Sequence, residues 1–311
     1  MKIGIDIGGT KCAVVLGDET GIMKKIKFPT TTCEETIAKI IEAAESIGEA
    51  DAIGISCGGP LDSEKGIIMS PPNLRGWDDV HITDILSERF GIPAYLCNDA
   101  NACALAEWKY GAGRGTKNMI FLTFGTGLGA GLILGGKLYG GTNGMAGEIG
   151  HVRLADYGPV GYGKQGSAEG FCSGGGIAQI GKTLAYERLQ RGEVLPYCKS
   201  VSELDSINAK VLADHADRGD EVGLEAYRIS GEMLGKALSI LVDVLNPEAI
   251  VIGSVFARSE ALLRPHMEKT LNRETLTASH GVCRVLPAAL GDSIGDYAAL
   301  AVAIEGGKAD E

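Results

Sequence analysis

The chain has 311 residues, about twice the length of an ordinary domain, and its 45% hydrophobic and 22% charged residues are typical of a globular protein. A net charge of -11 without a basic stripe argues against a nucleic-acid partner, and no apolar run is long enough to span a membrane. Glycine is the exception: 46 residues are about twice the usual share and predict many sharp turns or close backbone approaches.

The cysteines and the N-terminal residues indicate the compartment. The eight cysteines are scattered and form no C-x-x-C pair, which argues against a zinc clasp built from cysteine pairs. Asp6 and the nearby glycines interrupt any apolar run of the signal-peptide kind. We therefore expect a cytoplasmic protein in a reducing setting.

Strands and helices alternate in the first part of the chain. Ile3, Ile5 and Ile7 alternate as in a half-buried strand, and apolar residues at helical spacing predict a helix over 34–48. The other expected elements are a strand at 13–16, a strand at 51–56, a long loop at 58–77, a helix at 79–90, a strand at 92–97 and a helix at 99–110.

The composition changes after residue 110, since 22 glycines lie among the 66 residues from 111 to 176. We expect strands at 119–124, 130–134 and 249–252, and helices at 174–191, 202–217, 220–245, 257–272 and 295–305. This places one α/β lobe at 1–115 and a larger α/β lobe at 116–294, with the C-terminal helix (about 295–308) packing on the first lobe.

Two glycine-rich turns share one plan of strand, turn and strand, over residues 3–16 and 120–134. Turns of Gly and Thr present backbone N–H groups and hydroxyls to phosphate oxygens. The first also carries Asp6, a carboxylate suited to Mg²⁺ directly or through water. A plain hairpin turn is the alternative for each. Neither is a Walker A loop or a G-x-G-x-x-G turn before a helix.

Polar residues suggest catalysis and sugar binding. Asn98 and Asp99 lie where a strand ends and a helix begins. The structural interpretation is that one of them caps the helix N-terminus. The functional interpretation is that Asp99 is a general base. Glu148, His151 and Glu169 lie in the glycine-dense stretch, where such side chains are structural or bind neighbouring sugar hydroxyls. Asn73 is either a turn residue or another sugar contact.

Taken together, the motifs resemble the ROK family (repressor, open reading frame, kinase) over nearly the whole chain. They are DIGGTK at 6–11, GGPLD at 58–62 with PNL at 72–74, NDANACALAE at 98–107, GTGLGAG at 125–131 and GEIGH at 147–151, with weaker matches in SGGG at 173–176 and GSVF at 253–256. The resemblance implies a two-lobed actin-like ATPase fold (ribonuclease H-like, α/β) with an interlobe cleft.

The resemblance also implies roles for individual residues. Asp99 is the general base for a sugar hydroxyl, and Asp6 helps to place Mg²⁺. The implied sugar ligands are Gly59, Asn73, Asn98, Asp99, Glu148, His151 and Glu169. The implied ATP contacts are Asp6, Gly8, Gly9, Thr10, Lys11, Gly125, Thr126, Gly127, Gly175 and Gly253. Phosphoryl transfer depends mainly on such positioning and charge neutralisation.

The chain departs from the family pattern in two places. Family members usually carry a zinc knuckle after the GEIGH histidine, but the three cysteine positions hold Val160, Tyr162 and Ser167, so no structural zinc is expected. Family repressors carry a DNA-binding segment before the first phosphate loop, and that loop begins here at residue 6, so we do not expect a repressor.

The expected activity is ATP-dependent phosphorylation of a hexose, at O6 and with glucose favoured. N-acetylmannosamine, allose and fructose are alternative substrates. A non-catalytic sugar sensor is the alternative of another class, although Asp6, Asp99 and both phosphate loops argue against it. A dehydratase activator with the same fold would need cysteines for an iron–sulfur cluster, and the cysteine spacing of this chain does not supply them. The resemblance implies a homodimer.

Overall fold

The computed structural model describes residues 1–279 and 281–309 of the chain. It forms two compact units, and the polypeptide passes between them four times. Unit 1 comprises residues 1–121, 131–146 and the segment from Ala289 onward, and unit 2 comprises Leu122–Ala130 and Gly147–Ala288. The first crossing lies within a strand after Phe121 rather than near residue 115, and 131–146 returns to unit 1. A boundary placed at a loop misses this because β9 and β10 each pass from one unit to the other without a break.

Unit 1 contains a five-stranded mixed sheet in the order β3-β2-β1-β4-β8. Strands β1, β2 and β3 are antiparallel neighbours, and β4 and β8 continue from β1 in parallel. The strands are β1 (Lys2–Ile7), β2 (Lys11–Asp18), β3 (Gly21–Pro29), β4 (Ile53–Cys57) and β8 (Ala94–Asn98). The parallel arrangement brings the carboxyl ends of β1, β4 and β8 to one edge, where Asp6, Cys57 and Asn98 lie.

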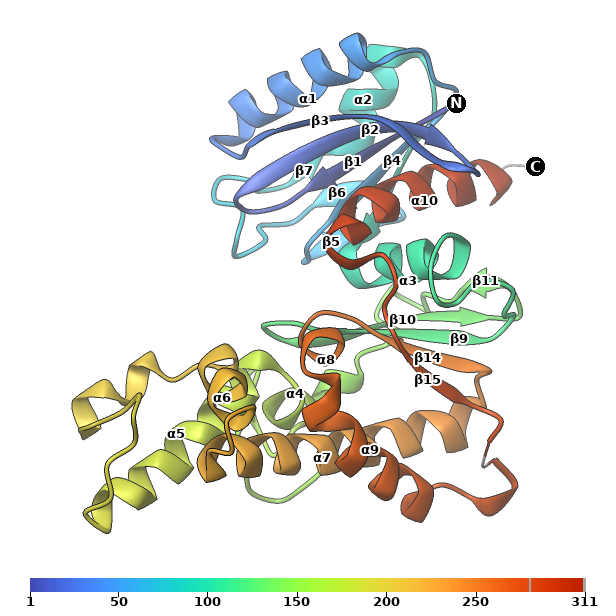
Figure 1. Cartoon of the computed structure of the whole chain (residues 1–311). Coiled ribbons are helices and arrows are strands. Elements are labelled where there is room, and N and C mark those ends of the chain that lie inside the picture. Colours follow the sequence, from blue (N-terminus) through green and yellow to red (C-terminus); the bar gives the residue numbers. More distant parts are fainter. Residues whose placement is uncertain (280, 310–311) are drawn as a thin grey trace. The chain divides into compact units, whose positions relative to one another are not determined.

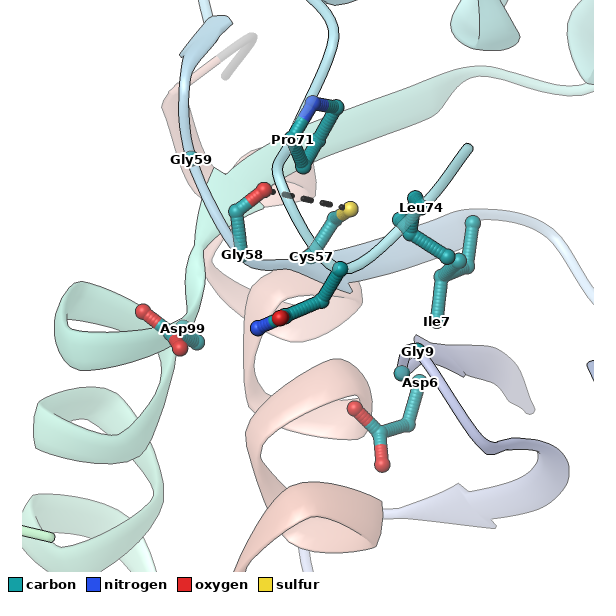
Figure 2. Close-up of a pocket in the computed structure, with 11 residues that line it drawn as sticks. Asp6, Ile7, Gly9, Cys57, Gly58, Gly59, Pro71, Leu74 and Asp99 are labelled. Atoms are coloured by element: carbon teal, nitrogen blue, oxygen red, sulfur yellow. Dashed lines mark hydrogen bonds between the residues drawn. The ribbon is translucent and has the colours of Figure 1, made fainter. Parts of the chain in front are cut away.

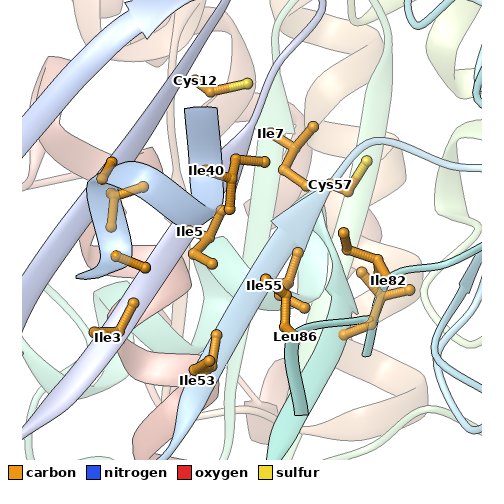
Figure 3. Packing of buried hydrophobic residues seen from close by; sticks show 14 of the residues in the cluster. Ile3, Ile5, Ile7, Cys12, Ile40, Ile53, Ile55, Cys57, Ile82 and Leu86 are labelled. Carbon is orange, nitrogen blue, oxygen red and sulfur yellow. The ribbon is translucent and has the colours of Figure 1, made fainter. Parts of the chain in front are cut away.

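Helices cover both faces of this sheet (Figure 1). They are α1 (Cys33–Ile47), α2 (Ile82–Phe90), α3 (Asp99–Lys109) and α10 (Ile294–Ala309). On the α1 and α2 face, the isoleucines of β1 and β4 form a fully buried core with Ile40, Ile82 and Leu86 (Figure 3). Alternation along the strands supplies this apolar face, as the sequence pattern predicts.

The opposite face packs against the C-terminal helix α10, which contacts β1, β4 and α3. Glycines allow this close approach: a Cβ on Gly4 would lie 2.5 Å from the backbone nitrogen of Leu300, and one on Gly54 would lie 2.2 Å from that of Ala303. The last helix of the chain therefore completes the core of unit 1.

The segment predicted as a loop over 58–77 contains short strands. These are β5 (Leu61–Asp62) and β6 (Ile67–Ile68), which pair with each other. A third short strand, β7 (Val80–His81), lies just after this segment and pairs with β6. The small sheet buries Ile68 and Trp77 against the main core. It thereby fixes the course of the intervening Pro71–Leu74 turn.

A second five-stranded sheet has the order β11-β10-β9-β14-β15. Its strands are β9 (Met119–Phe124), β10 (Leu128–Leu134), β11 (Lys137–Leu138), β14 (Ala249–Ile252) and β15 (Arg284–Pro287). Unit 2 adds the hairpin of β12 (Val160–Gly161) and β13 (Lys164–Gln165). Its helices are α4 (Ala168–Phe171), α5 (Gly174–Gln190), α6 (Ala209–Ala216), α7 (Glu221–Leu245), α8 (Val255–Arg258) and α9 (Glu260–Glu274).

The elements depart from the sequence prediction mainly at exposed or short segments. Strands β3 and β15 were not predicted because both are edge strands: β3 carries exposed lysines, and none of the four residues of β15 is fully buried. The helix expected over 202–217 is a 3₁₀ turn (Val201–Ser206) followed by α6. Within the described residues, no helix is both long and apolar enough to cross a membrane.

Candidate functional site

The first glycine-rich turn joins β1 to β2 and is held by backbone and side-chain hydrogen bonds. The Gly8 N–H donates to the Lys11 carbonyl at 3.2 Å, and the Thr30 hydroxyl donates to the Gly8 carbonyl at 2.6 Å. A Cβ on Gly9 would lie only 2.5 Å from the Asn73 carbonyl oxygen. Glycine at position 9 therefore lets the turn and the 71–74 segment meet.

A cavity of about 170 Å³ opens beside this turn, within unit 1. Figure 2 shows the Asp6 and Asp99 carboxylates on different sides of it. The cavity is smaller than the ~300–1,000 Å³ of drug-sized ligand sites, which suits a small polar ligand. Its lining residues are Asp6, Ile7, Gly8, Gly9, Cys57, Gly58, Gly59, Pro71, Asn73, Leu74 and Asp99.

Six residues predicted from the sequence thus share one cavity: Asp6, Gly8, Gly9, Gly59, Asn73 and Asp99. Thr10 and Lys11 belong to the same turn but do not line the cavity. The other five lining residues were not among the predicted site residues: Ile7, Cys57, Gly58, Pro71 and Leu74. Cys57 and Gly58 could have been found from the sequence, because they lie at the end of a strand that runs parallel to β1 and so ends near Asp6.

Asp99 is the first residue of α3, directly after the parallel strand β8. Asn98 is the N-cap, and its side-chain oxygen accepts from the Asn101 N–H at 2.8 Å. The Asp99 carboxylate accepts from the Ala100 N–H at 2.8 Å and is accessible from solvent. The surrounding protein nevertheless limits its hydration and raises the pKa of Asp99 above its usual range. A carboxyl group in this state is a stronger proton acceptor once ionised.

Asp6 faces two further carboxylates. Burial, and then the negative charges of Asp296 and Asp99, raise the pKa of Asp6 to about 6, although Lys11 and Lys25 oppose this shift. Asp296, in the first turn of α10, is buried and ion-paired with Lys25. The incompletely neutralised negative charge around Asp6 fits a hard cation such as Mg²⁺. Among the described residues, no three acidic, histidine or cysteine side chains are grouped to enclose a metal alone.

The second glycine-rich turn, Gly125–Thr126–Gly127, joins β9 to β10 in unit 2. The Gly125 N–H donates to the Gly127 carbonyl at 3.0 Å, and the Gly174 N–H donates to the Gly125 carbonyl at 2.8 Å. The N-terminus of the 17-residue helix α5 therefore meets this turn. A Cβ on Gly175 would lie 3.3 Å from the Thr126 carbonyl oxygen.

Gly253 belongs to the same neighbourhood of unit 2. Its N–H donates to the Leu122 carbonyl at 2.9 Å, which ties the end of β14 to β9. The next residue, Ser254, has φ +57°, and its hydroxyl would lie 3.7 Å from a Cβ on Gly125. Unit 2 thus brings together the second turn, Gly175 and Gly253.

Glu169 lies in α4 and contacts the second turn directly. Its Oε2 accepts from the Leu128 N–H at 3.0 Å and would lie 2.6 Å from a Cβ on Gly127. Ser167 caps α4 by accepting from the Gly170 N–H at 3.1 Å. The carboxylate expected to bind sugar therefore also supports the second glycine-rich turn.

Glu148 precedes a 3₁₀ turn (Ile149–His151) that ends with His151, and both residues are exposed. The His151 ring meets Tyr162 edge to face, with ring centroids 5.7 Å apart and planes at 88°. The Lys164 ammonium donates to the His151 carbonyl at 2.6 Å. These contacts come from the β12–β13 hairpin, which occupies the place of the zinc knuckle expected from the family pattern.

That hairpin turns through Tyr162 and Gly163, with φ of +44° and +75°. Positive φ at both central residues is the geometry of a two-residue type I′ connection. Gly161 fits closely against α4, since a Cβ there would lie 2.7 Å from the Glu169 Cβ. Backbone pairing and this packing hold the turn, and no cysteine takes part.

Comparison with known proteins decides the family. The model of the ROK family matches residues 2–305. The chain belongs to the ROK family. It is 33% identical over 302 residues to a glucokinase of Streptomyces coelicolor, covering 95% of each chain. It therefore has the two-domain actin-like fold of this family, in agreement with the fold class expected from its motifs.

Two solved structures of the family align with nearly the whole chain. The ROK hexokinase of Thermus thermophilus superposes with a TM-score of 0.83, at 28% identity and 99% coverage of both chains. A ROK glucokinase of Streptomyces griseus, solved in complex with glucose and AMPPNP, superposes with a TM-score of 0.76, at 31% identity, covering 98% of this chain and 99% of that one.

Proposed function

We propose that this protein transfers the γ-phosphoryl group of ATP to O6 of glucose, with Asp99 as the general base. It is an ATP-dependent sugar kinase, since its relatives include a glucokinase and a ROK glucokinase crystallised with glucose and AMPPNP. The choice of glucose, of O6 and of Asp99 is our proposal. The observation that carries it is the cavity shared by Asp99 and the Asp6–Lys11 turn.

Asp99 has the properties of a base for a sugar hydroxyl. Its carboxylate opens into a small cavity lined by Asn73 and Gly59, which offer a side-chain amide and a backbone to sugar hydroxyls. Restricted hydration raises the Asp99 pKa, which strengthens it as an acceptor of the hydroxyl proton. The ionised carboxylate takes that proton as the hydroxyl oxygen attacks the γ-phosphorus.

The donor phosphates would meet the glycine turns. Gly8, Gly9 and Thr10 would hold phosphate oxygens in unit 1, and Gly125, Thr126 and Gly127 would do so in unit 2, with Gly175 and Gly253 on the nucleoside side. Asp6 would hold Mg²⁺, directly or through water, together with phosphate oxygens. When bound, the ion neutralises charge that develops on the phosphates during transfer.

The remaining sugar contacts lie in unit 2. We assign Glu148, His151 and Glu169 to sugar hydroxyls. Glu169 uses one oxygen for the Leu128 N–H, so its second oxygen is the one assigned to the sugar. We also assign Asn98 to the sugar, through its side-chain NH₂ group, because its side-chain oxygen already caps α3.

We also propose a cytoplasmic homodimer. All eight cysteines lie among the described residues as free thiols, which suits a reducing compartment. We infer the dimer from the resemblance of the sequence to the ROK family. Light scattering after size exclusion will measure the mass in solution, and a monomer at all concentrations would contradict the dimer.

A coupled assay of ADP release over a panel of sugars tests the proposal. Glucose should give the highest kcat/KM, and N-acetylmannosamine, allose and fructose lower values. NMR of the product should show the phosphate on O6. Tight sugar binding without turnover of any sugar would instead indicate a sensor.

A further inference from the structure

The β12–β13 hairpin is too short to be stable by itself. Each strand has only two residues, Val160–Gly161 in β12 and Lys164–Gln165 in β13, and the two strands form a sheet of their own. An isolated two-stranded hairpin is at best marginally stable in water. The tip adds a further cost, because Tyr162 is a non-glycine residue with φ +44°. Contacts with the rest of unit 2 must therefore hold this hairpin in place.

Gln179, on the helix α5, supplies such a contact at the outer edge of β12. Its Oε1 accepts from the Val160 N–H at 2.9 Å, and its Nε2 donates to the Val160 carbonyl, also at 2.9 Å. Two residues of adjacent antiparallel strands exchange the same pair of bonds. One side-chain amide therefore takes the place of a third strand beside β12.

The hairpin in turn contacts two side chains that we assign to sugar. A Cβ on Gly161 would lie 2.7 Å from the Glu169 Cβ, so β12 lies directly against this residue. On the other strand, the Lys164 ammonium donates to the His151 carbonyl at 2.6 Å. The ring of Tyr162, at the tip, meets the His151 ring edge to face. A displacement of the hairpin would therefore disturb His151 and Glu169 together.

The helix α5 is a firm base for Gln179. It is 17 residues long, and its first residue, Gly174, donates its N–H to the Gly125 carbonyl of the second glycine-rich turn. Ile177 and Ile180, which flank Gln179 along the helix, are buried. Packing of these neighbours fixes the helix, and the half-buried Gln179 side chain is left at its border with the hairpin.

We propose that Gln179 is a positioning residue for the sugar site, which holds the β12–β13 hairpin through Val160 and thereby orients His151 and Glu169. The inference rests on the proposed function, in which those two residues bind sugar. Gln179 has no assigned contact with sugar or nucleotide, so its effect passes through the hairpin. The role requires an amide, because only a group that both donates and accepts can satisfy the N–H and the carbonyl of Val160.

Steady-state kinetics of Gln179→Met tests the inference, since methionine keeps the length of the side chain without the amide. KM for sugar should rise about three- to tenfold, as expected for the loss of one or two exposed hydrogen bonds, with kcat and KM for ATP nearly unchanged. Gln179→Glu should not restore KM, because a carboxylate accepts from the Val160 N–H but cannot donate to its carbonyl. Gln190→Met, at the exposed last residue of α5, is the matched control.

Hydrogen exchange measured by mass spectrometry, without substrates, tests the support of the hairpin directly. Peptides that cover residues 160–165 should exchange faster in Gln179→Met than in the wild type or Gln190→Met. Tm should be nearly unchanged, because both bonds of Gln179 are exposed.

The outcomes separate this inference from the proposed function. A wild type that turns over no sugar would overturn the proposed function and the inference with it. If the wild type is active, an unchanged KM for sugar or unchanged exchange of the hairpin in Gln179→Met would overturn the inference alone. A fall in Tm and kcat at constant KM, or normal kinetics of Gln179→Glu, would also overturn it.

Discussion

The carboxylate of Glu169 accepts a hydrogen bond from the backbone N–H of Leu128, at 3.0 Å. These residues are 41 positions apart, and Leu128 directly follows the second glycine-rich turn. One side chain therefore links the motif assigned to sugar with the loop assigned to phosphate. The link makes Glu169 different from the other proposed sugar ligands.

Replacing Glu169 should accordingly affect both substrates. Glu169→Ala leaves the Leu128 N–H without its charged partner, at a cost of about 1.5–3 kcal/mol. We expect KM for ATP as well as KM for sugar to rise by about tenfold or more. Steady-state kinetics with each substrate varied will measure this, and Glu148→Ala should raise KM for sugar alone. An unchanged KM for ATP in Glu169→Ala would show that the link has no role in donor binding.

Asp99→Asn should remove the proposed base while keeping the shape of the side chain. We expect kcat to fall by about 10²–10⁴-fold, the usual contribution of general base catalysis, with little change in KM for sugar. Asp84→Asn, which also changes a carboxylate in the first turn of a helix, is the control. Near-normal turnover of Asp99→Asn would exclude Asp99 as the base.

The pH dependence of kcat/KM should report the environment of Asp99 in the free enzyme. Restricted hydration raises the Asp99 pKa, and the base acts only when ionised. Activity should therefore be complete above this raised pKa and fall as the pH drops through it, at a higher pH than for an ordinary aspartate. A profile of kcat/KM for the sugar will give the midpoint. A midpoint at or below the ordinary value for aspartate would contradict the assignment.

Tyr162 should position His151 without stabilising the fold. Tyr162 is 86% exposed and its ring meets the edge of His151, so Tyr162→Ala removes an aromatic contact worth about 0.5–1.5 kcal/mol. We expect KM for sugar to rise about two- to tenfold, while Tm stays unchanged and Tyr162→Phe behaves like the wild type. Tyr157→Ala, at an equally exposed residue, is the control. Equal effects of the two alanine variants would argue against a specific role.

Gly54 should be essential for the packing of α10. Gly54→Ala places a methyl group 2.2 Å from the Ala303 backbone nitrogen, and backbone cannot move aside as a flexible side chain can. We expect a loss of about 1–3 kcal/mol or more in the free energy of unfolding, measured by denaturant titration. Gly140→Ala adds its Cβ in nearly open space and should be close to neutral. Equal stability of both variants would show that α10 adjusts freely.

The first turn and its cavity were largely predictable, because they depend on local patterns. Alternating isoleucines lead into Asp6, and a strand followed by a helix places Asp99. The parallel strands β1, β4 and β8 then bring Asp6 and Asp99 to the same edge of the sheet.

Contacts that depend on strand register or distant packing were not predictable. The placement of Lys11, Lys25 and Lys27 on one face depends on the β2–β3 register. The sequence of β3 looks like a polar loop, because its position at the edge of the sheet leaves its lysines exposed. Asp296 reaches the neighbourhood of Asp6 only because α10 packs on β1. The Glu169 bond to Leu128 likewise arises from packing within unit 2.

The placement of α10 has a consequence for synthesis of the protein. Unit 2 is made entirely of residues before Ala289, whereas unit 1 needs α10 to cover Gly4 and Gly54. Chains grow from the N-terminus, and domains generally fold as units. The N-terminal strands therefore leave the ribosome first but wait for the final helix, and unit 2 has all of its residues earlier. In this protein the order of translation and the order in which the two units are complete run in opposite directions.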